Sequence, residues 1–276
     1  MAQVIKDKQD MTHLSWTHIR SSSGTAGSFL KATDDLREPK VYYKLSNYDN
    51  QRGVTGHECV NEIIADRLLS ILGVEHLNYS LIHADIIVEG RKVETYLCAS
   101  EDFKKRGETK VALDVYYGVE KQPDETPMDF CLRNGWGEYV YQFLAVDFLI
   151  LNRDRHGANM EVLRNSKEKT VRLAPIFDNG LSLLFNCHTE EQVQKFDPME
   201  DKPVQCFVGS RSTRRNLELI PADAFPAFNR LTEEHREILL EDLNGVMPRL
   251  WLDKIWDMIW RRWKVYEDFR NTRRGG

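Results

Sequence analysis

The stretch that decides the fold is Leu151-Asn152-Arg153-Asp154-Arg155-His156-Gly157-Ala158-Asn159, followed by Ala174-Pro175-Ile176-Phe177-Asp178-Asn179-Gly180. A predicted helix leads into the first segment and a predicted hairpin leads into the second, so two carboxylates and one amide come to the ends of these elements. Hard oxygen ligands of this kind bind divalent cations. In phosphoryl transfer, one Asp orients the attacking hydroxyl while an Asn and a second Asp hold Mg²⁺. Neither fragment is specific alone, but their combination in this order indicates such a site.

The composition sets the class of protein. The 276 residues are enough for one two-lobed domain or two small ones. The 38 basic and 43 acidic side chains give a formal charge of −5, which offers no electrostatic reason to expect direct nucleic-acid binding. Five scattered cysteines without CxxC spacing indicate reduced thiols. Without a signal peptide or an apolar run long enough to span a bilayer, we expect a cytoplasmic monomer; export by a signal-independent route stays open.

Apolar periodicity predicts the order of the elements. We expect a polar N-terminal segment of about forty residues, a long loop over 186–216, and a last helix over 250–269. Thr232 is the predicted N-cap of a helix that ends near Asn244. The other expected elements are a strand over 41–45, a helix over 57–72 stopped by Gly73, strands over 77–88 and 92–99, a helix over 138–151 and a hairpin of 160–163 with 171–174. Strands first and helices afterwards predict an α+β fold of two lobes.

The motif Asp154-Arg155-His156-x-x-Asn159 with Phe177-Asp178-x-Gly180 resembles the active-site signature of HipA-like kinases, which share a fold with phosphatidylinositol 3/4-kinases and, more remotely, with protein kinases. Upstream, Tyr43-Lys44 and Asn61-Glu62-Ile63-Ile64-Ala65 resemble that family's nucleotide-binding lysine and the helix behind it. The chain is most similar to the compact, stand-alone bacterial members, among them the cell-translocating kinase type. The resemblance implies a protein-kinase-like fold, with a β-rich nucleotide-binding lobe over 1–100, a mainly helical catalytic lobe over 101–276 and a hinge near 99–104.

The resemblance also implies a role for each motif residue. Asp154 orients the substrate hydroxyl, Asn159 and Asp178 bind Mg²⁺, and Lys44 contacts the α- and β-phosphates of ATP. Glu58 and Glu62 share one helix face, so both remain candidates for the lysine's partner, although the alignment favours Glu62. Backbone groups of Ala99 to Glu101 are expected at the adenine edge, with Phe103 packed nearby. His156 is expected to brace the loop around Asp154.

A glycine-containing segment precedes the lysine strand, where a phosphate-covering loop belongs. Gly24-Thr25-Ala26-Gly27-Ser28 is neither a GxGxxG loop nor a P-loop, but its two glycines allow close backbone approach to anionic oxygens. We therefore predict nucleotide contacts from Gly24, Thr25, Gly27 and Ser28. Autophosphorylation of Ser21, Ser22, Ser23 or Ser28 would add charge that competes with ATP.

These predictions combine into one function. We expect an ATP- and Mg²⁺-dependent kinase that transfers the γ-phosphoryl group to Ser or Thr of a protein substrate. One alternative is a phosphoinositide or other small-hydroxyl kinase on the same fold, which the basic loop Gly209-Ser210-Arg211-Ser212-Thr213-Arg214-Arg215 keeps open. A second alternative is a non-catalytic nucleotide-binding pseudokinase. The presence of Lys44, Asp154, Asn159 and Asp178 counts against it.

Overall fold

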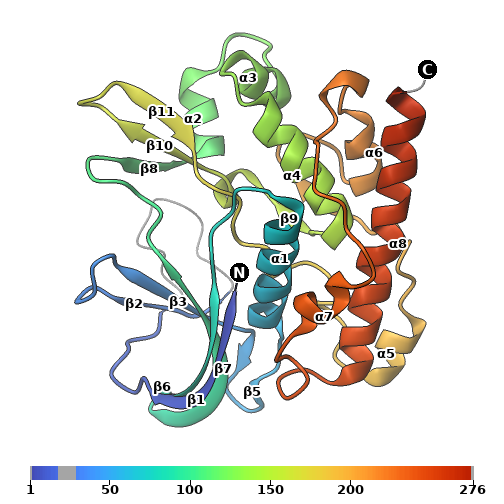
Figure 1. Cartoon of the computed structure of the whole chain (residues 1–276). Helices are drawn as coiled ribbons and strands as arrows, with labels where there is room; N and C mark the ends of the chain where they lie inside the picture. The colour runs from blue at the N-terminus through green and yellow to red at the C-terminus, as the bar shows by residue number, and fades with distance from the viewer. Residues whose placement is uncertain (1, 18–28, 275–276) are drawn as a thin grey trace.

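The computed structural model describes residues 2–17 and 29–274, and its arrangement is drawn in Figure 1. The predicted phosphate loop and the four predicted autophosphorylation serines lie outside the described residues. In the described chain, no helix is both long enough and apolar enough to cross a membrane.

A five-stranded sheet forms the N-terminal part of the fold. Its strand order is β1-β6-β7-β3-β2, in which β1 runs parallel to β6 and the other neighbours are antiparallel. The polar start of the chain gave no indication of β1, because this strand is an exposed edge with almost no buried side chain to create an apolar pattern. The strands are β1 (Gln3–Asp10), β2 (Lys31–Asp34), β3 (Val41–Leu45), β6 (Ser80–Val88) and β7 (Arg91–Glu101), with a small pair of β4 (Tyr48–Asp49) and β5 (Gly53–Val54) beside them.

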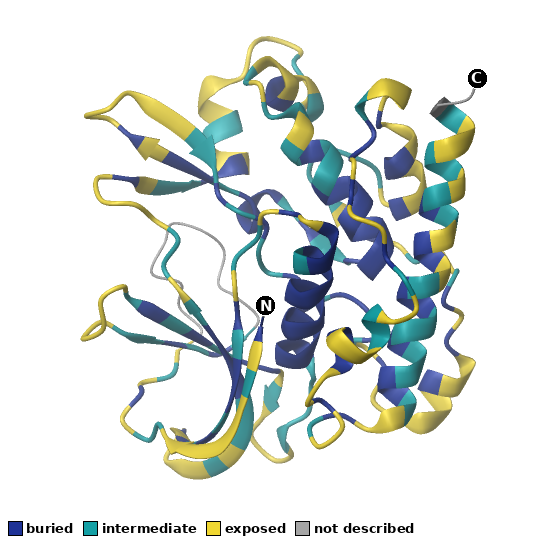
Figure 2. Cartoon of the chain, viewed as in Figure 1, coloured by how far each residue is buried: buried dark blue, intermediate teal, exposed yellow. Residues whose placement is uncertain are grey.

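Helix α1 (Glu58–Leu72) lies between this sheet and the helices that follow (Figure 1). Every residue of α1 except Ser70 is buried, and Figure 2 shows the helix dark blue along most of its length. Gly73 ends the helix in a left-handed conformation, with φ of 75°, and its N–H bonds back to the carbonyls of Leu69 and Ser70. The helix therefore carries polar residues such as Glu62 into the interior, where each needs a partner.

The rest of the chain is mainly helical. Helix α4 (Gly137–Ile150), buried from Phe143 to its end, leads directly into the sequence motif around Asp154. The helices are α2 (Leu113–Glu120), α3 (Pro127–Arg133), α4 (Gly137–Ile150), α5 (Glu190–Lys195), α6 (Thr213–Glu218), α7 (His235–Leu240) and α8 (Arg249–Arg274), with 3₁₀ turns η1 (Gly157–Asn159) and η2 (Ala222–Ala224). The strands β10 (Glu161–Asn165), β11 (Thr170–Leu173) and β8 (Thr109–Ala112) form one small sheet, and β9 (Asp154–Arg155) pairs with β12 (Gln205–Cys206) in another.

Three sequence predictions for the C-terminal part are wrong in detail. The segment 186–216 is not a continuous loop, because it contains α5, β12 and α6. Thr232 does not cap a long helix, because its N–H donates to Nδ1 of His235. The helix at this place, α7, spans only His235–Leu240. The last helix continues to Arg274, beyond the expected end at residue 269. These elements are short or extend through polar sequence, where apolar periodicity is a weak guide.

Buried Arg262 joins α8 to α4. Its guanidinium donates to the carbonyl oxygens of Pro198 at 2.8 Å, Phe148 at 2.9 Å and Glu200 at 2.9 Å. Burial lowers the pKa of Arg262 to about 10, against the attraction of Asp201 and Asp197. The three carbonyls belong to two segments far apart in sequence, so this one side chain fixes them relative to each other.

His57, directly before α1, gives the fold a predicted pH dependence. Its Nε2 lies 2.9 Å from the Leu184 carbonyl oxygen, and burial lowers its pKa from 6.5 to about 4 despite that bond. An unfolded histidine binds a proton below pH 6.5 whereas the folded one stays neutral to about pH 4. As the pH falls from 6.5 to 4, the free energy of unfolding should therefore decrease by roughly 3 kcal/mol because of this side chain alone.

Urea titrations at several pH values would measure that slope. We expect His57→Gln to flatten it between pH 6.5 and 4, whereas His13→Gln, at an exposed histidine, should leave it as in the wild type. Parallel slopes for all three proteins would contradict the assignment.

Candidate active site

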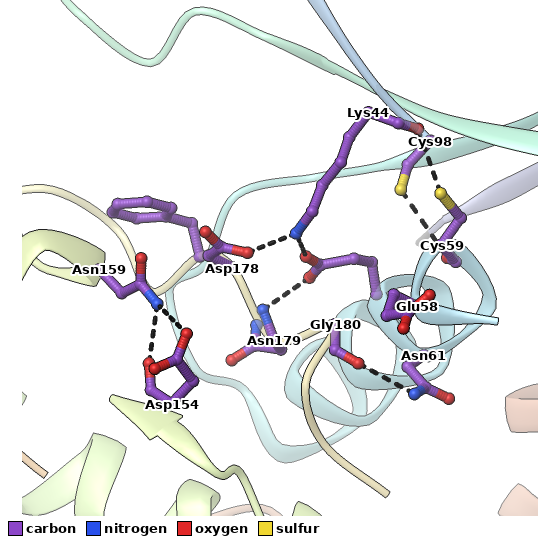
Figure 3. A network of polar contacts seen from close by, with 12 residues as sticks. Lys44, Glu58, Cys59, Asn61, Cys98, Asp154, Asn159, Asp178, Asn179 and Gly180 are labelled. Carbon is purple, nitrogen blue, oxygen red and sulfur yellow. Dashed lines mark hydrogen bonds and ion pairs between the residues drawn. The ribbon is translucent and has the colours of Figure 1, made fainter. Parts of the chain in front are cut away.

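Lys44 on β3 is the centre of a buried ion cluster. Its Nζ donates to Oε1 of Glu62 on α1 at 2.9 Å and to Oδ1 of Asp178, and Figure 3 shows the side chain extending toward both the helix and the Asp178 loop. Glu58 takes a different partner, because its Oε2 accepts a hydrogen bond from the Asn47 backbone N–H at 3.0 Å. Of the two acids on this helix face, the structure pairs Glu62 with the lysine.

The electrostatics of this cluster favour a charged lysine. Burial alone would lower the pKa of Lys44, but the carboxylates of Asp178 and Glu62 outweigh it and hold that pKa well above its usual range. Burial raises the pKa of Glu62, and the neighbouring Asp178 adds to the rise while Lys44 opposes it. A cation held between two acids in this way is positioned for anionic ligands such as phosphates.

The Asp178 loop is held by hydrogen bonds to side chains of α1. The Asn179 N–H donates to Oε2 of Glu62 at 2.8 Å, and Asn61 Nδ2 donates to the carbonyls of Gly180 and Ser182, each at 3.0 Å. Asp178 itself has a φ of 58°, a left-handed conformation that non-glycine residues adopt at a cost of about 1–3 kcal/mol. The helix that carries Glu62 therefore also fixes the backbone that presents Asp178.

Asp154 and Asn159 face each other across a tight loop. Asn159 Nδ2 donates to the Asp154 carbonyl oxygen at 2.7 Å and to Oδ2 of its carboxylate at 3.3 Å (Figure 3). His156 Nδ1 accepts from the Ala158 N–H at 3.1 Å, and His156 Nε2 lies 3.5 Å from Oδ2 of Asp154. Burial raises the pKa of Asp154, with His156 opposing and Asp178 adding to the rise. The geometry of His156 is that of a residue bracing this loop.

Arg155 connects the two motif segments, a function that the sequence did not reveal. The buried guanidinium donates to both carboxylate oxygens of Asp147, to the Phe177 carbonyl at 2.9 Å and to Oδ1 of Asn179 at 2.7 Å. Asp147 attracts the guanidinium strongly enough to outweigh its burial and raise the pKa of Arg155. Asp147, three residues before the end of α4, was the available indication, because an acid in so apolar a helix needs a buried partner.

A cleft of about 680 Å³ opens beside Lys44 and Asp178. Tyr42, Ser100, Glu101, Phe103 and Lys110 are among its lining residues. The Phe103 ring lies 5.7 Å from the Phe177 ring and has the Lys110 ammonium over it at 4.0 Å. Asp154 and Asn159 lie outside this lining, on the far side of Asp178.

The register of β7 distinguishes the backbone groups of the predicted hinge. Ala99 is buried and pairs with both Tyr43 and Ser80, so it lies inside the sheet. The Asp102 N–H donates to the Lys40 carbonyl, and in an antiparallel pair neighbouring residues alternate direction. The backbone N–H and C=O of Glu101 therefore point away from β3. On that side Glu101 has no partner in β6, whose first residue, Ser80, pairs with Ala99. Glu101 thus combines a place in the lining of the cleft with backbone groups that are not used by β3.

The oxygen donors fit Mg²⁺ in their chemistry. Asp178 supplies a carboxylate, and Asn159 has its amide nitrogen turned to Asp154, which places its amide oxygen on the opposite side of the group. Among the described residues there is no group of three or more His, Cys, Asp or Glu that could hold a metal by itself. A cation bound here would need further oxygens from its ligand, as phosphates provide.

Gly157, in the loop between Asp154 and Asn159, touches the start of α2. A Cβ at this position would lie 2.4 Å from Cβ and 3.0 Å from the backbone nitrogen of Asp114. Gly157→Ala is expected to destabilise the protein by about 1–3 kcal/mol and to displace the loop. Gly118→Ala is the control, since nothing lies within 4 Å of its added Cβ and alanine favours the helix. Thermal melts of both variants test this, and equal stability of the two would contradict it.

Solved structures show which fold this is. The crystal structure of a Helicobacter pylori proinflammatory kinase, CtkA, is similar with a TM-score of 0.61 at 15% identity, covering 96% of this chain and 97% of that chain. HipA of Shewanella oneidensis, solved with HipB and operator DNA, matches with a TM-score of 0.39 at 15% identity, over 84% of this chain and 52% of its own. No family model matches the sequence, and no curated protein is significantly similar to it.

The likeness to CtkA assigns the chain to the two-lobed, kinase-like α+β class. It confirms the predicted fold class and, at the level of fold, the resemblance to the HipA-like kinases. The boundary near residue 100 between the two lobes stays a prediction.

Proposed function

We propose that this protein is an ATP- and Mg²⁺-dependent kinase that phosphorylates Ser or Thr of a protein substrate. The observation that carries the proposal is that Lys44 and Asp178 meet in one cleft, with Glu62 buried behind Lys44 and the Asp154–Asn159 pair close to Asp178. Phosphoryl transfer requires a cation for the phosphates, a carboxylate and an amide for Mg²⁺, and a carboxylate base for the acceptor hydroxyl. Lys44, Asp178 with Asn159, and Asp154 are the candidates for these three parts.

Each residue has a proposed task. Lys44 binds the α- and β-phosphates, the Glu101 backbone meets the adenine edge, and Asp154 orients the acceptor hydroxyl and takes its proton. Asp178 and Asn159 hold Mg²⁺, which neutralises phosphate charge when it is bound. The raised pKa of Asp154 suits this base, because a stronger base accepts a hydroxyl proton more readily.

Transfer of ³²P from γ-labelled ATP, with Mg²⁺ or with EDTA, tests the proposal. Wild-type protein should label itself or proteins of a cell lysate only with Mg²⁺, and Asp178→Asn should abolish the labelling. Asp223→Asn, the same substitution at an exposed aspartate, should behave as the wild type. A fully active Asp178→Asn protein would refute the site, and mass spectrometry of residues 21–28 would test the proposed autophosphorylation.

A further inference from the structure

We propose that Arg211, Arg214 and Arg215, here called the arginine cluster, select acceptor segments that carry acidic side chains close to the Ser or Thr. This inference rests on the proposed function and specifies its substrate class. The arginine cluster lies in the part of 186–216 that the sequence predicted to be a loop and that instead folds against the Asp154 segment.

Pairing between β12 and β9 places the arginine cluster near Asp154. Gln205 is the parallel partner of Asp154, and the Gln205 N–H donates to the Arg153 carbonyl at 2.9 Å. The preceding Val204 donates its N–H to the Arg211 carbonyl at 3.0 Å. From standard strand spacings, the Cα atoms of Asp154 and Arg211 are within roughly 14 Å. That distance corresponds to about four residues of an extended peptide.

The backbone that carries the arginine cluster is fixed on both sides. Oδ1 of buried Asn216 accepts from the Ser210 N–H at 2.7 Å, and Asn216 Nδ2 donates to the Ser210 carbonyl at 3.1 Å. On the other side, Asp201 accepts from the hydroxyls of Ser212 and Thr213. A fixed backbone lowers the entropy that a bound peptide must overcome when it orders the loop.

The side chains of the arginine cluster form no ion pairs within residues 2–17 and 29–274. All three side chains are exposed. Glu218, the nearest acid along the chain, forms no ion pair with them within the same residues, and Asp201 accepts from the hydroxyls of Ser212 and Thr213. Three exposed guanidinium groups without an ion pair, on a chain with a net charge of −5, form a local positive site for carboxylates or phosphates.

The surroundings favour a protein segment over an anionic membrane as the source of these acids. A bilayer presents negative charge to the whole facing surface, so the net charge of −5 opposes its approach, whereas a short peptide meets only the local site. The exposed neighbours of the arginine cluster also include acidic and polar side chains, among them Asp201, Gln205 and Glu218, that do not insert into lipid.

Peptide binding without ATP tests the inference independently of catalysis. The probe is a fluorescent peptide with one serine flanked by glutamates, compared with the same peptide carrying glutamines. We expect the protein to bind the glutamate peptide about tenfold more tightly at low salt, and that advantage to shrink as salt is added. Equal affinities for the two peptides would overturn the proposal, even if the protein proves to be an active kinase.

Charge-swapped variants sharpen the test. Combined R211E, R214E and R215E should reverse the preference, so that a peptide with lysines around the serine becomes the better ligand and the better acceptor by kcat/KM. The matched control combines R37E, R52E and R230E, which makes the same charge change at three exposed arginines elsewhere and should keep the wild-type preference. If the folded triple variant still preferred the glutamate peptide, the assignment would be wrong.

Lipid vesicles distinguish the remaining source of anionic groups. Vesicles with a phosphoinositide should neither bind preferentially through the arginine cluster nor act as acceptors. Phosphorylation of such vesicles in preference to the glutamate peptide would overturn the inference in favour of a lipid substrate. Absence of phosphate transfer to every acceptor, with glutamate-peptide binding intact, would instead count against the proposed kinase activity alone.

Discussion

Asp154→Asn is expected to lower the rate of γ-phosphoryl transfer by about 10²–10⁴-fold while the protein stays folded. The carboxylate of Asp154 accepts one long bond from Asn159 Nδ2, at 3.3 Å. The two shorter bonds run through its backbone, since its N–H donates to Asn152 Oδ1 and its carbonyl accepts from Asn159 Nδ2. An asparagine keeps both bonds and nearly the same volume. It removes only the carboxylate, the group proposed to receive the hydroxyl proton.

Three measurements separate this expectation from its rivals. Transfer of labelled phosphate gives the rate, a fluorescent nucleotide titration gives the affinity, and a thermal melt gives the stability. We expect the transfer rate to fall by the stated factor, and the nucleotide affinity and the melting temperature to stay close to those of the wild type. A variant that transfers phosphate at the wild-type rate would remove Asp154 from the mechanism, and a pseudokinase would show nucleotide binding with no transfer in either protein.

Arg155→Leu is expected to destabilise the fold by about 3–5 kcal/mol, because it leaves the Asp147 carboxylate buried without a cation. The Phe177 carbonyl and the Asn179 side chain also lose a donor. Since these two residues flank Asp178, phosphate transfer should fall in the fraction that remains folded. Urea denaturation measures the stability change.

A double substitution tests the cause. Arg155→Leu combined with Asp147→Leu should recover much of the lost stability, because replacing a buried pair by apolar groups is often neutral or favourable. It should not recover transfer, because the Asp178 loop still lacks its support. If the double variant were no more stable than Arg155→Leu, the unpaired Asp147 would not be the source of the loss.

The sequence predicted the main elements of the site but not what positions them. The resemblance to HipA-like kinases pointed to Lys44, Asp154, Asn159 and Asp178, and the structure brings Lys44 against Asp178 and Asn159 against Asp154. The choice between Glu58 and Glu62 depends on how closely α1 approaches β3, a tertiary distance that helical periodicity does not contain. The positive φ of Asp178 likewise arises from contacts with α1 rather than from a local preference for glycine or asparagine.

The missed parts share another physical cause. The edge strand β1 and the segment 201–216 are stabilised mainly by backbone pairing and by single polar bonds. Such bonds leave no periodic apolar pattern in a sequence. Arg155 was quoted in the motif, but its four-way bonding requires α4, β9 and the Asp178 loop to be in place.

Lys44 and Arg262 should respond differently to salt. Lys44 is attracted by carboxylates in a cleft, so added ions can weaken its attraction for Asp178 and for anionic ligands. Arg262 instead donates to three carbonyl dipoles in the interior, where mobile ions do not reach. The junction of α8 with α4 should therefore hold at ionic strengths that already weaken the attraction of Lys44 for anionic ligands, so that high salt should affect the cleft before it unfolds the protein.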